Sequence, residues 1–327
     1  MLEIINDSNN PYFNLALEEY VVKNVPVESL FIIWQNSPVV VIGKNQNALA
    51  EVNMEFLEKE NIALVRRISG GGAVYHDLGN LNFTFVAKKG QGVVFDFERF
   101  TNPIIKTLDK IGIKATHNGR NDITIDGKKF SGNAQFRYRD KVMHHGTILY
   151  NVNLENMVQA LNVSEEKIVS KGIKSVRSRV TNICEHLAGN LAVEEFKELL
   201  VQNLKQEADI KQTYELSTID LENIKKLQIE KYNSWVWNIG ESPDYNIIKK
   251  GKFEWGNIEF RFKIVGNMIE TCKIYGDFFA DQDIEILEKE LQQIPYEKMS
   301  LKALFDKLNI EDFLPNSNNS EIMDLFF

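Results

Sequence analysis

The chain is poor in cysteine, with only Cys184 and Cys272 among its 327 residues. Their positions match neither a disulfide framework nor the paired spacing of a zinc site, so a disulfide-bonded domain and a zinc-stabilised domain are both excluded. Long hydrophobic runs are also missing. The longest, LFIIW and PVVVIG, are far too short to cross a bilayer. We therefore expect a protein with no membrane segment and no structural zinc.

An excess of positive charge is absent as well. The formal net charge is −8 at pH 7, which argues against bulk binding of nucleic acid. Any anionic ligand must then be held by a local cluster of Lys or Arg. The first residues, MLEIINDSNNPYF, lack the basic start and apolar stretch of a secretory signal. These absences together predict a cytoplasmic protein.

What is present is typical of a soluble globular chain: 43% hydrophobic and 26% charged residues, long enough for one large domain and a smaller one. Strand-like runs such as SLFIIWQ and LNFTFVA alternate with helical segments such as NLALEEYVVKN. Because the two kinds are intermixed, we expect an α/β (α+β) domain with a substantial sheet. The helix predicted at NPIIKTLDKIGI has Pro103 near its start.

The pattern changes past residue 245. Residues 258–264 alternate apolar and charged side chains, and Gly-Asn pairs at 256–257 and 266–267 suit hairpin turns. Two helical patterns follow, DIEILEKELQQI and SLKALFDKLNI. We expect a small α+β accessory domain over residues 247–327, after a first domain over residues 1–246.

A hairpin is predicted at NDITIDGKKFSG, residues 121–132, with Asp126-Gly127 as its turn. Pairing outward from the turn sets Thr124 opposite Lys129 and Ile123 opposite Phe130. One face is then apolar, and the other carries Asp122, Thr124, Lys129 and Ser131. The pattern alone leaves open whether this polar face meets water or lines a site.

Three consecutive glycines, Gly70 to Gly72, stand between Arg66-Arg67 and His76-Asp77 in RRISGGGAVYHDLGN. Each glycine loses much conformational freedom on folding, so the run indicates a close approach of a ligand or of another chain segment. It matches neither common phosphate-loop pattern. Exposed backbone N–H groups beside a guanidinium would nevertheless suit an anion.

Two further segments carry candidate chemistry. In HHGT, residues 144–147, the adjacent histidines of a strand point to opposite faces, so at most one of His144 and His145 can face a site. Residues 167–180, KIVSKGIKSVRSRV, hold five basic side chains and no acid. This stretch is either a solvated loop or a segment that closes over phosphates.

Six motifs taken in order resemble bacterial lipoate–protein ligases along nearly the whole chain: RRISGGGAVYHDLGN, GRNDI, GKKFSGNAQ, HHGT, KGIKSVRSRVTNI and SWVWNIG. The resemblance implies a class II biotinyl/lipoyl-ligase-like fold, in which helices flank a mixed sheet, followed by a small α+β C-terminal accessory domain. It also implies a monomeric enzyme that works in two steps. Lipoate and ATP, with Mg²⁺, give lipoyl-AMP and pyrophosphate. A lysine of an apo lipoyl domain then attacks the mixed anhydride and releases AMP. The implied partners are the apo lipoyl domains of 2-oxoacid dehydrogenase complexes and the glycine-cleavage H protein.

The resemblance also assigns residues. The catalytic lysine of the K-x-S-G segment falls on Lys129, where a cation between carboxylate and α-phosphate removes their repulsion. Nucleotide contacts are implied for Arg67, Gly72, Ala73, Val74, Tyr75 and Lys129. Lipoate contacts are implied for Ser69, Gly70, Gly71, His76, Lys129 and His145. Asp122, with Asn121, is the candidate ligand set for Mg²⁺, and residues 167–179 match the adenylate-binding loop.

Three alternatives remain at this stage. An octanoyl or lipoyl transferase, or an amidotransferase, of the same superfamily would need an activated thiol, for which Cys184 is the nearest candidate. A biotin–protein ligase is disfavoured because no GRGR signature is present. A catalytically silent lipoate-binding protein would not need Lys129 or the glycine run.

Overall fold

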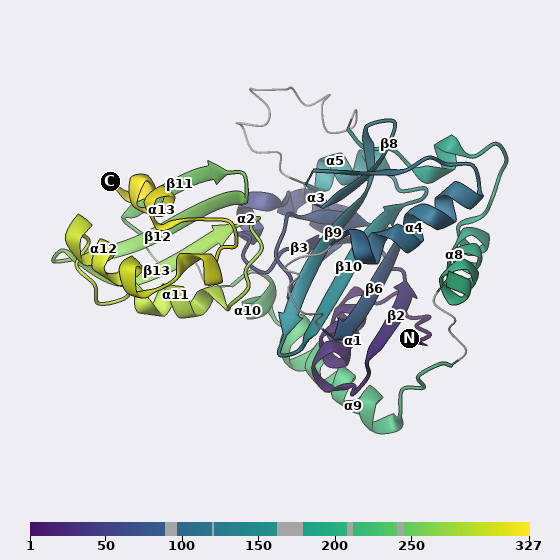
Figure 1. Ribbon diagram of the computed structural model, residues 1–327, viewed down its shortest axis with the longest axis horizontal. Helices are drawn as coiled ribbons and strands as arrows, with labels where there is room; N and C mark the ends of the chain where they lie inside the picture. Colours follow the sequence, from purple (N-terminus) through teal and green to yellow (C-terminus); the bar gives the residue numbers. More distant parts are fainter. Residues whose placement is uncertain (89–96, 120, 162–178, 208–211, 241–244) are drawn as a thin grey trace. The chain divides into compact units, whose positions relative to one another are not determined.

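The computed structural model describes residues 1–88, 97–119, 121–161, 179–207, 212–240 and 245–327. It contains α-helices and three β-sheets, in line with the mixed α/β class that the sequence predicts (Figure 1). The chain divides into two compact units. The first comprises residues 1–41, 49–66 and 73–238, and the second comprises residues 42–48, 67–72 and 239–327. No helix among the described residues has the length and apolar character needed to cross a membrane.

A seven-stranded sheet forms the centre of the first unit, in the order β1-β2-β6-β10-β9-β8-β7. Only the β1–β2 pair is parallel. The strands of this seven-stranded sheet are β1 (Leu2–Glu3), β2 (Ser29–Trp34), β6 (Asn80–Lys88), β7 (Thr116–Asn118), β8 (Asp122–Ile125), β9 (Lys128–Tyr138) and β10 (Lys141–Leu149). A smaller sheet has the order β4-β3-β5, from β3 (Val39–Ile42), β4 (Ala63–Arg66) and β5 (Val74–His76).

Helices cover both faces of the large sheet (Figure 1). On one face lies α1 (Pro11–Asn24), whose Glu18 reaches Thr84 of β6 and His145 of β10. We call this the α1 face. On the other lies α4 (Glu98–Lys110), whose Phe100 packs on Phe85 and His144. The side chain of Asn10 caps α1, and Pro11 follows at its first position, where a missing N–H costs nothing.

The remaining helices before residue 239 lie wholly in this unit, except that Ala48 of α2 belongs to the second. They are α2 (Ala48–Glu51), α3 (Met54–Lys59), α5 (Leu154–Ala160), η1 (Ile183–His186), α8 (Val193–Glu207), α9 (Thr218–Leu227), η2 (Gln228–Tyr232) and α10 (Trp235–Asn238). The helix predicted from residue 102 begins earlier, at Glu98, so Pro103 lies inside α4 rather than at its start. The side chain of Thr107 donates to the carbonyl of Pro103.

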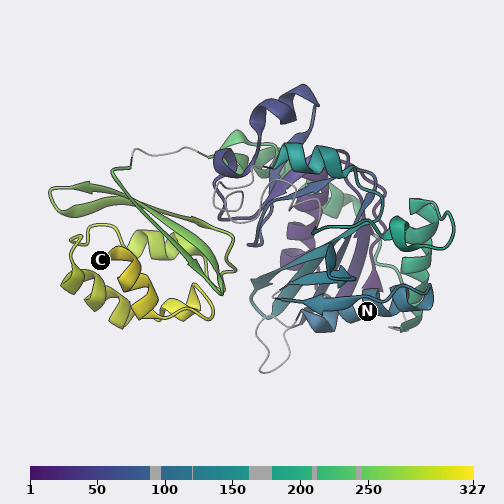
Figure 2. The same cartoon turned by 90° about the horizontal axis from the view of Figure 1, so that it is seen from above.

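In the second unit a three-stranded antiparallel sheet packs one face against helices (Figure 2). Its elements are β11 (Ile247–Phe253), β12 (Gly256–Val265), β13 (Met268–Gly276), α11 (Ile284–Glu290), α12 (Lys298–Lys307), η3 (Ile310–Asp312) and α13 (Asn319–Phe326). As predicted, Ile258, Phe260 and Phe262 enter the core. The turn predicted at 266–267 is present, with positive φ at both residues. The turn predicted at 256–257 is wrong, because Phe253 pairs with Gly256 and the chain reverses at 254–255.

Candidate active site

The glycine-rich turn, Gly70 to Gly72, lies in the second unit, where it meets the backbone that follows β13. The N–H of Gly71 donates to the carbonyl of Phe278 at 3.4 Å, and Gly71 has φ of +89°. A Cβ on Gly70 would overlap that same carbonyl oxygen. Two of the three glycines therefore allow another chain segment to approach. Gly72 differs, since no described heavy atom lies within 4 Å of the place of its Cβ.

The two arginines before the turn have different partners. Arg66 donates through Nε to the carbonyl of Trp237 at 2.8 Å and through Nη2 to that of Asn238 at 2.9 Å. Arg67 donates instead to the turn itself, from Nη2 to the carbonyls of Gly70 at 2.6 Å and Gly72 at 2.8 Å. Its Nε also donates to Ser69 Oγ at 3.0 Å. Arg67 thus holds the conformation of the glycine-rich turn.

The residues that follow the turn form β5 in the first unit. Ala73 and Val74 are half-buried, while Tyr75 and His76 are buried. Burial raises the pKa of the Tyr75 hydroxyl above its usual value. The Nδ1 atom of His76 lies 3.1 Å from the side-chain amide of Asn36. β5 pairs with β3, so Val74, Tyr75 and His76 extend the smaller sheet, and Ala73 precedes the strand.

Lys129 lies on β9 beside Asp122 of β8, with 2.6 Å between Nζ and the carboxylate. Both side chains are about one third exposed, so the Lys129 side chain is only partly covered by the protein. It also lies against Gly132, where a Cβ would come within 2.9 Å of Nζ. The backbone of Lys129 bonds to that of Arg179 and Thr181, which places these residues beside β9. The structure therefore brings Lys129 and Asp122 together, as the hairpin predicts.

The hairpin differs from the prediction at one position. Thr124 pairs with Lys129 as predicted, but the register then shifts, and Ile123 pairs with Ser131 instead of Phe130. Phe130 is the extra residue of a β-bulge. Ser131 consequently shares a face with Ile123, and its predicted place beside Lys129 is wrong. Gly132, opposite Asp122, takes that place.

Asn121, the second candidate ligand for Mg²⁺, exchanges two side-chain hydrogen bonds with Asn133. Its Nδ2 donates to the carbonyl of Asn133 at 2.6 Å, and Asn133 Nδ2 donates to the carbonyl of Asn121 at 3.0 Å. Among the described residues, no three His, Cys, Asp or Glu side chains gather closely enough to hold a metal ion. Mg²⁺ usually takes one or two carboxylates and completes its shell with water and substrate phosphates. Asp122 fits the role of that single carboxylate, with the Asn121 side-chain oxygen as the only neighbouring predicted ligand.

His145 lies on the α1 face within a buried polar network. Its Nδ1 is 2.9 Å from the carboxylate of Glu18, which also accepts from Thr84 Oγ1 at 2.5 Å. Thr84 Oγ1 in turn accepts from the indole Nε1 of Trp34 at 2.9 Å. Glu18 and Thr84 were not identified from the sequence. A carboxylate on an amphipathic helix is normally solvated, and nothing in the local pattern indicates otherwise.

The neighbouring His144 points to the opposite face, as expected for adjacent strand residues. It is fully buried beneath α4, stacked on Phe100, with its ring nitrogens bonded to Gln135 and Asn133. Burial holds the pKa of His144 well below its ordinary value, so the ring stays neutral. Its role is in packing. Most of the basic stretch 167–179 lies outside the described residues, and only Arg179 can be placed.

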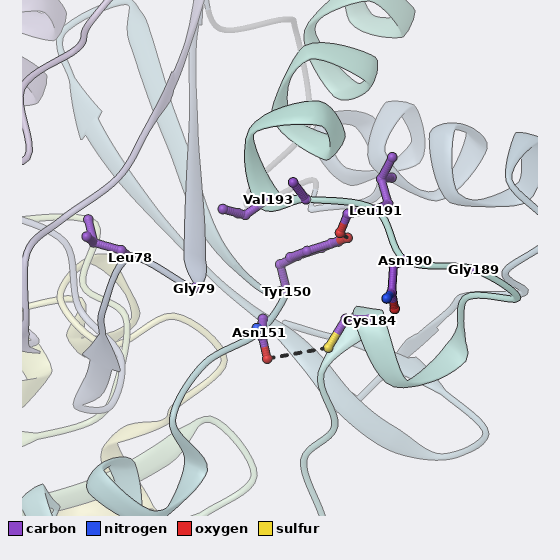
Figure 3. A pocket seen from close by; sticks show the side chains of 10 residues that line it. Leu78, Gly79, Tyr150, Asn151, Cys184, Gly189, Asn190, Leu191 and Val193 are labelled. Carbon is purple, nitrogen blue, oxygen red and sulfur yellow. Dashed lines mark hydrogen bonds between the residues drawn. The ribbon is translucent and has the colours of Figure 1, made fainter.

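Cys184 lines a cavity of about 600 Å³ on another part of the first unit, together with Leu78, Tyr150, Asn151 and Leu191 (Figure 3). The thiol donates to Asn151 Oδ1 at 3.6 Å (Figure 3). Burial, and secondarily the charge of Glu185, raises the pKa of the Cys184 thiol. Burial likewise raises the pKa of the Cys272 thiol. Because a thiol nucleophile needs a lowered pKa, neither cysteine is prepared for thioester chemistry.

Comparison with protein families matches both parts of the chain. Residues 10–205 match the lipoyl protein ligase A/B catalytic domain, and residues 242–326 match the bacterial lipoate protein ligase C-terminus. Among curated proteins, the chain is 40% identical to the lipoate-protein ligase LplJ of Bacillus subtilis over the full length of both. It is also 40% identical to lipoate–protein ligase 1 of Staphylococcus aureus, over 98% of each chain.

Solved structures of the same kind are similar in fold. A Plasmodium falciparum LipL1 structure with lipoate has a TM-score of 0.78 at 28% identity, covering 99% of this chain and 97% of that one. A bipartite lipoate protein ligase of Thermoplasma acidophilum, studied with its E2 lipoyl domain, has a TM-score of 0.66 at 26% identity, covering 75% and 98%. A lipoate-protein ligase A bound with ATP has a TM-score of 0.62 at 25% identity, covering 73% and 97%.

Proposed function

The chain belongs to the lipoate–protein ligase family and is an ATP-dependent ligase, and from this premise we propose how it acts and on what. Lipoate and ATP react first to give lipoyl-AMP and pyrophosphate. The ε-amine of a lysine on an apo lipoyl domain then attacks the acyl carbonyl, an amide forms, and AMP leaves. The acceptors are lipoyl domains of 2-oxoacid dehydrogenase complexes and the glycine-cleavage H protein.

The observation that carries the proposal is the placement of Lys129. Its ammonium group lies beside Asp122 and against a residue without a side chain, and about one third of the Lys129 side chain is exposed. In a chain of net charge −8, a carboxylate and a triphosphate need such a local cation before they can approach each other. Lys129 would lie between the attacking carboxylate oxygen and the α-phosphate, and would stabilise the negative charge that develops there.

The other assignments follow from the resemblance. We propose nucleotide contacts for Arg67, Gly72, Ala73, Val74, Tyr75 and Lys129, and lipoate contacts for Ser69, Gly70, Gly71, His76, Lys129 and His145. The exposure of Gly72 supports the first group, and the buried network around His145 supports the second. Mg²⁺ would be held by Asp122, with Asn121, and by substrate phosphates, and its charge would offset theirs.

The organisation of the chain is also part of the proposal. We place the catalytic domain at residues 1–246 and the accessory domain at residues 247–327. The second family match begins at residue 242, near this boundary, and the last segment of the second unit begins at Ile239. The protein would act as a monomer in the cytoplasm, where ATP is available.

The experiment combines the purified chain with ATP, Mg²⁺, lipoate and an apo H protein, and follows the H protein by intact mass. We expect its mass to rise by one lipoyl group, only when ATP is present. A second reaction uses an H protein whose acceptor lysine is replaced by alanine, which should gain nothing. No mass gain on the unaltered acceptor, with a folded enzyme, would contradict the proposal.

A cysteine-dependent transferase is the alternative, and the raised pKa of the Cys184 thiol argues against it. We expect Cys184→Ala to keep transfer within about twofold of the unaltered chain, because a group with a raised pKa is a poor nucleophile. The same mass measurement checks this. Loss of transfer in a folded Cys184→Ala protein would favour the thioester route instead.

A further inference from the structure

Two buried asparagines on β6, Asn80 and Asn82, leave amide atoms without hydrogen bonds. Asn80 Nδ2 donates to Asn82 Oδ1 at 3.0 Å. This bond fixes the orientation of Asn82 and leaves its Nδ2 group as an open donor. Neither Asn82 Nδ2 nor Asn80 Oδ1 has a partner among the described residues, although the side chains are only 2% and 0% exposed. Buried polar groups are nearly always paired, so these two require an explanation.

Asn82 lies on the α1 face, the same face as Thr84, His145 and Lys129. Asn82 and Thr84 are two residues apart on β6, so their side chains share a face. Across the sheet, Asn82 is opposite Trp34 on β2 and Thr147 on β10. The indole of Trp34 donates to Thr84, and Thr147 Oγ1 accepts from the N–H of Gly132. Neither neighbour bonds to Asn82 Nδ2.

The sheet also fixes where Asn82 lies relative to Lys129. The ammonium of Lys129 lies against Gly132 on β9, Gly132 bonds to Thr147 on β10, and Thr147 is opposite Asn82 on β6. Two strand spacings therefore separate Gly132 from Asn82, which is about 10 Å. A medium-chain fatty acid held by its carboxylate at Lys129 can place the far end of its acyl arm at about this distance.

We propose that Asn82 is a specificity-determining residue, which selects an acyl chain ending in a dithiolane over a plain alkyl chain. This inference rests on the proposed function of the site. Asn82 Nδ2 donates to a ring sulfur of lipoate, a weak acceptor that nevertheless pairs the buried N–H. An octanoyl tail offers no acceptor there, and its methyl end leaves the amide dehydrated and unpaired. Asn80 acts as a positioning residue, because its Nδ2 orients the Asn82 amide.

The test compares lipoate with octanoate as substrates for pyrophosphate release, with kcat and KM measured separately. We expect the unaltered chain to favour lipoate by about tenfold or more in kcat/KM, the size of effect that an unpaired buried donor gives. Asn82→Leu keeps the branching of the side chain and replaces the amide by methyl groups. It should bring the two acids within a few fold, mainly by lowering the KM for octanoate.

Asn190→Leu is the matched control, since it makes the same change at an exposed residue of the Cys184 cavity and should leave the preference unaltered. If Asn82→Leu does not fold, Asn82→Ala gives the same comparison. A preference that survives in the folded Asn82 variant, or an unaltered chain that uses both acids equally, overturns the inference. If the unaltered chain activates neither acid, the proposed function itself fails, and that result is distinct from either of these.

Discussion

The Lys129 side chain forms an ion pair with Asp122 and is still available to a ligand. Their contact of 2.6 Å neutralises a carboxylate that would otherwise repel incoming anions, while the exposed third of Lys129 leaves donors for a ligand. A surface ion pair of this kind contributes little to stability. We therefore expect replacement of Lys129 to affect chemistry far more than folding.

The burial of His144 predicts how the stability of the chain depends on pH. Its pKa is held low by burial, so the folded chain keeps the ring neutral while the unfolded chain takes up a proton near pH 6.5. The unfolded state then binds more protons as the pH falls below this value, and stability is lost in that direction. His144→Gln removes the effect. Between pH 7 and pH 5, the free energy of unfolding of the unaltered chain should fall by up to about 1.4 kcal/mol per pH unit more than that of the variant.

Denaturant titrations at several pH values measure this difference. His117→Gln serves as the control, because it removes an imidazole that is only half-buried at the edge of the sheet. Parallel pH profiles for the unaltered chain and His144→Gln would show that His144 takes up a proton as readily in the folded chain as in the unfolded chain, which contradicts this prediction.

Among the elements, the β8–β9 hairpin shows what a sequence can and cannot specify. The Asp126-Gly127 turn fixes the first two pairs, because both residues have positive φ and match the twist of the flanking strands. The bulge at Phe130 was not predictable, because the local pattern shows neither that the phenyl ring is buried nor that β9 also pairs with β10. The sequence could place Lys129 beside Asp122. It could not place Gly132 beneath the ammonium.

Longer elements were also predictable from the sequence only in part. The alternation of residues 258–262 predicts both faces of β12, because a period of two leaves one interpretation. The start of α4 was missed by several residues, since Pro103 favours a helix start but is tolerated inside when other bonds hold the helix. The buried Glu18, Thr84 and His145 network joins α1, β6 and β10, and such long-range pairing leaves no trace in the local sequence.

The glycine-rich turn offers a matched pair of substitutions. Gly70→Ala should lower the free energy of unfolding by about 1–3 kcal/mol, because the new methyl group would overlap the carbonyl oxygen of Phe278 and the backbone must shift. Gly72→Ala meets no described heavy atom within 4 Å and should change stability little. Thermal unfolding of both variants checks this. Equal losses would mean that the approach of Phe278 does not explain the glycine at position 70.

At the scale of the whole molecule, each compact unit is built from stretches that are not continuous in the sequence. Residues 42–48 and 67–72 belong to the second unit although they lie far from it in the chain. They are held there by local bonds, including Gly276 N–H to the carbonyl of Asn45 and the Lys44–Asp283 ion pair at 2.8 Å. A linear division of the sequence could not anticipate this, because these contacts join residues more than two hundred positions apart.

The net charge also acts at this scale. With 46 acidic and 38 basic side chains, the chain repels anions on average, so activation of a carboxylate by ATP depends on particular cations. We propose that Lys129 is the cation at the reacting atoms. The adjacent Lys128, at the exposed start of β9, carries the same charge but lies on the opposite face.

The most direct test of the central claim is therefore lipoate-dependent pyrophosphate release by Lys129→Ala and Lys128→Ala, measured side by side with circular dichroism of each. We predict that Lys129→Ala lowers the rate by about 10²–10³-fold, or about 3–4 kcal/mol, as removal of one charge-stabilising donor does. Lys128→Ala should stay within a few fold of the unaltered chain. An unchanged rate in a folded Lys129→Ala protein, or an equal loss in both variants, would contradict the account.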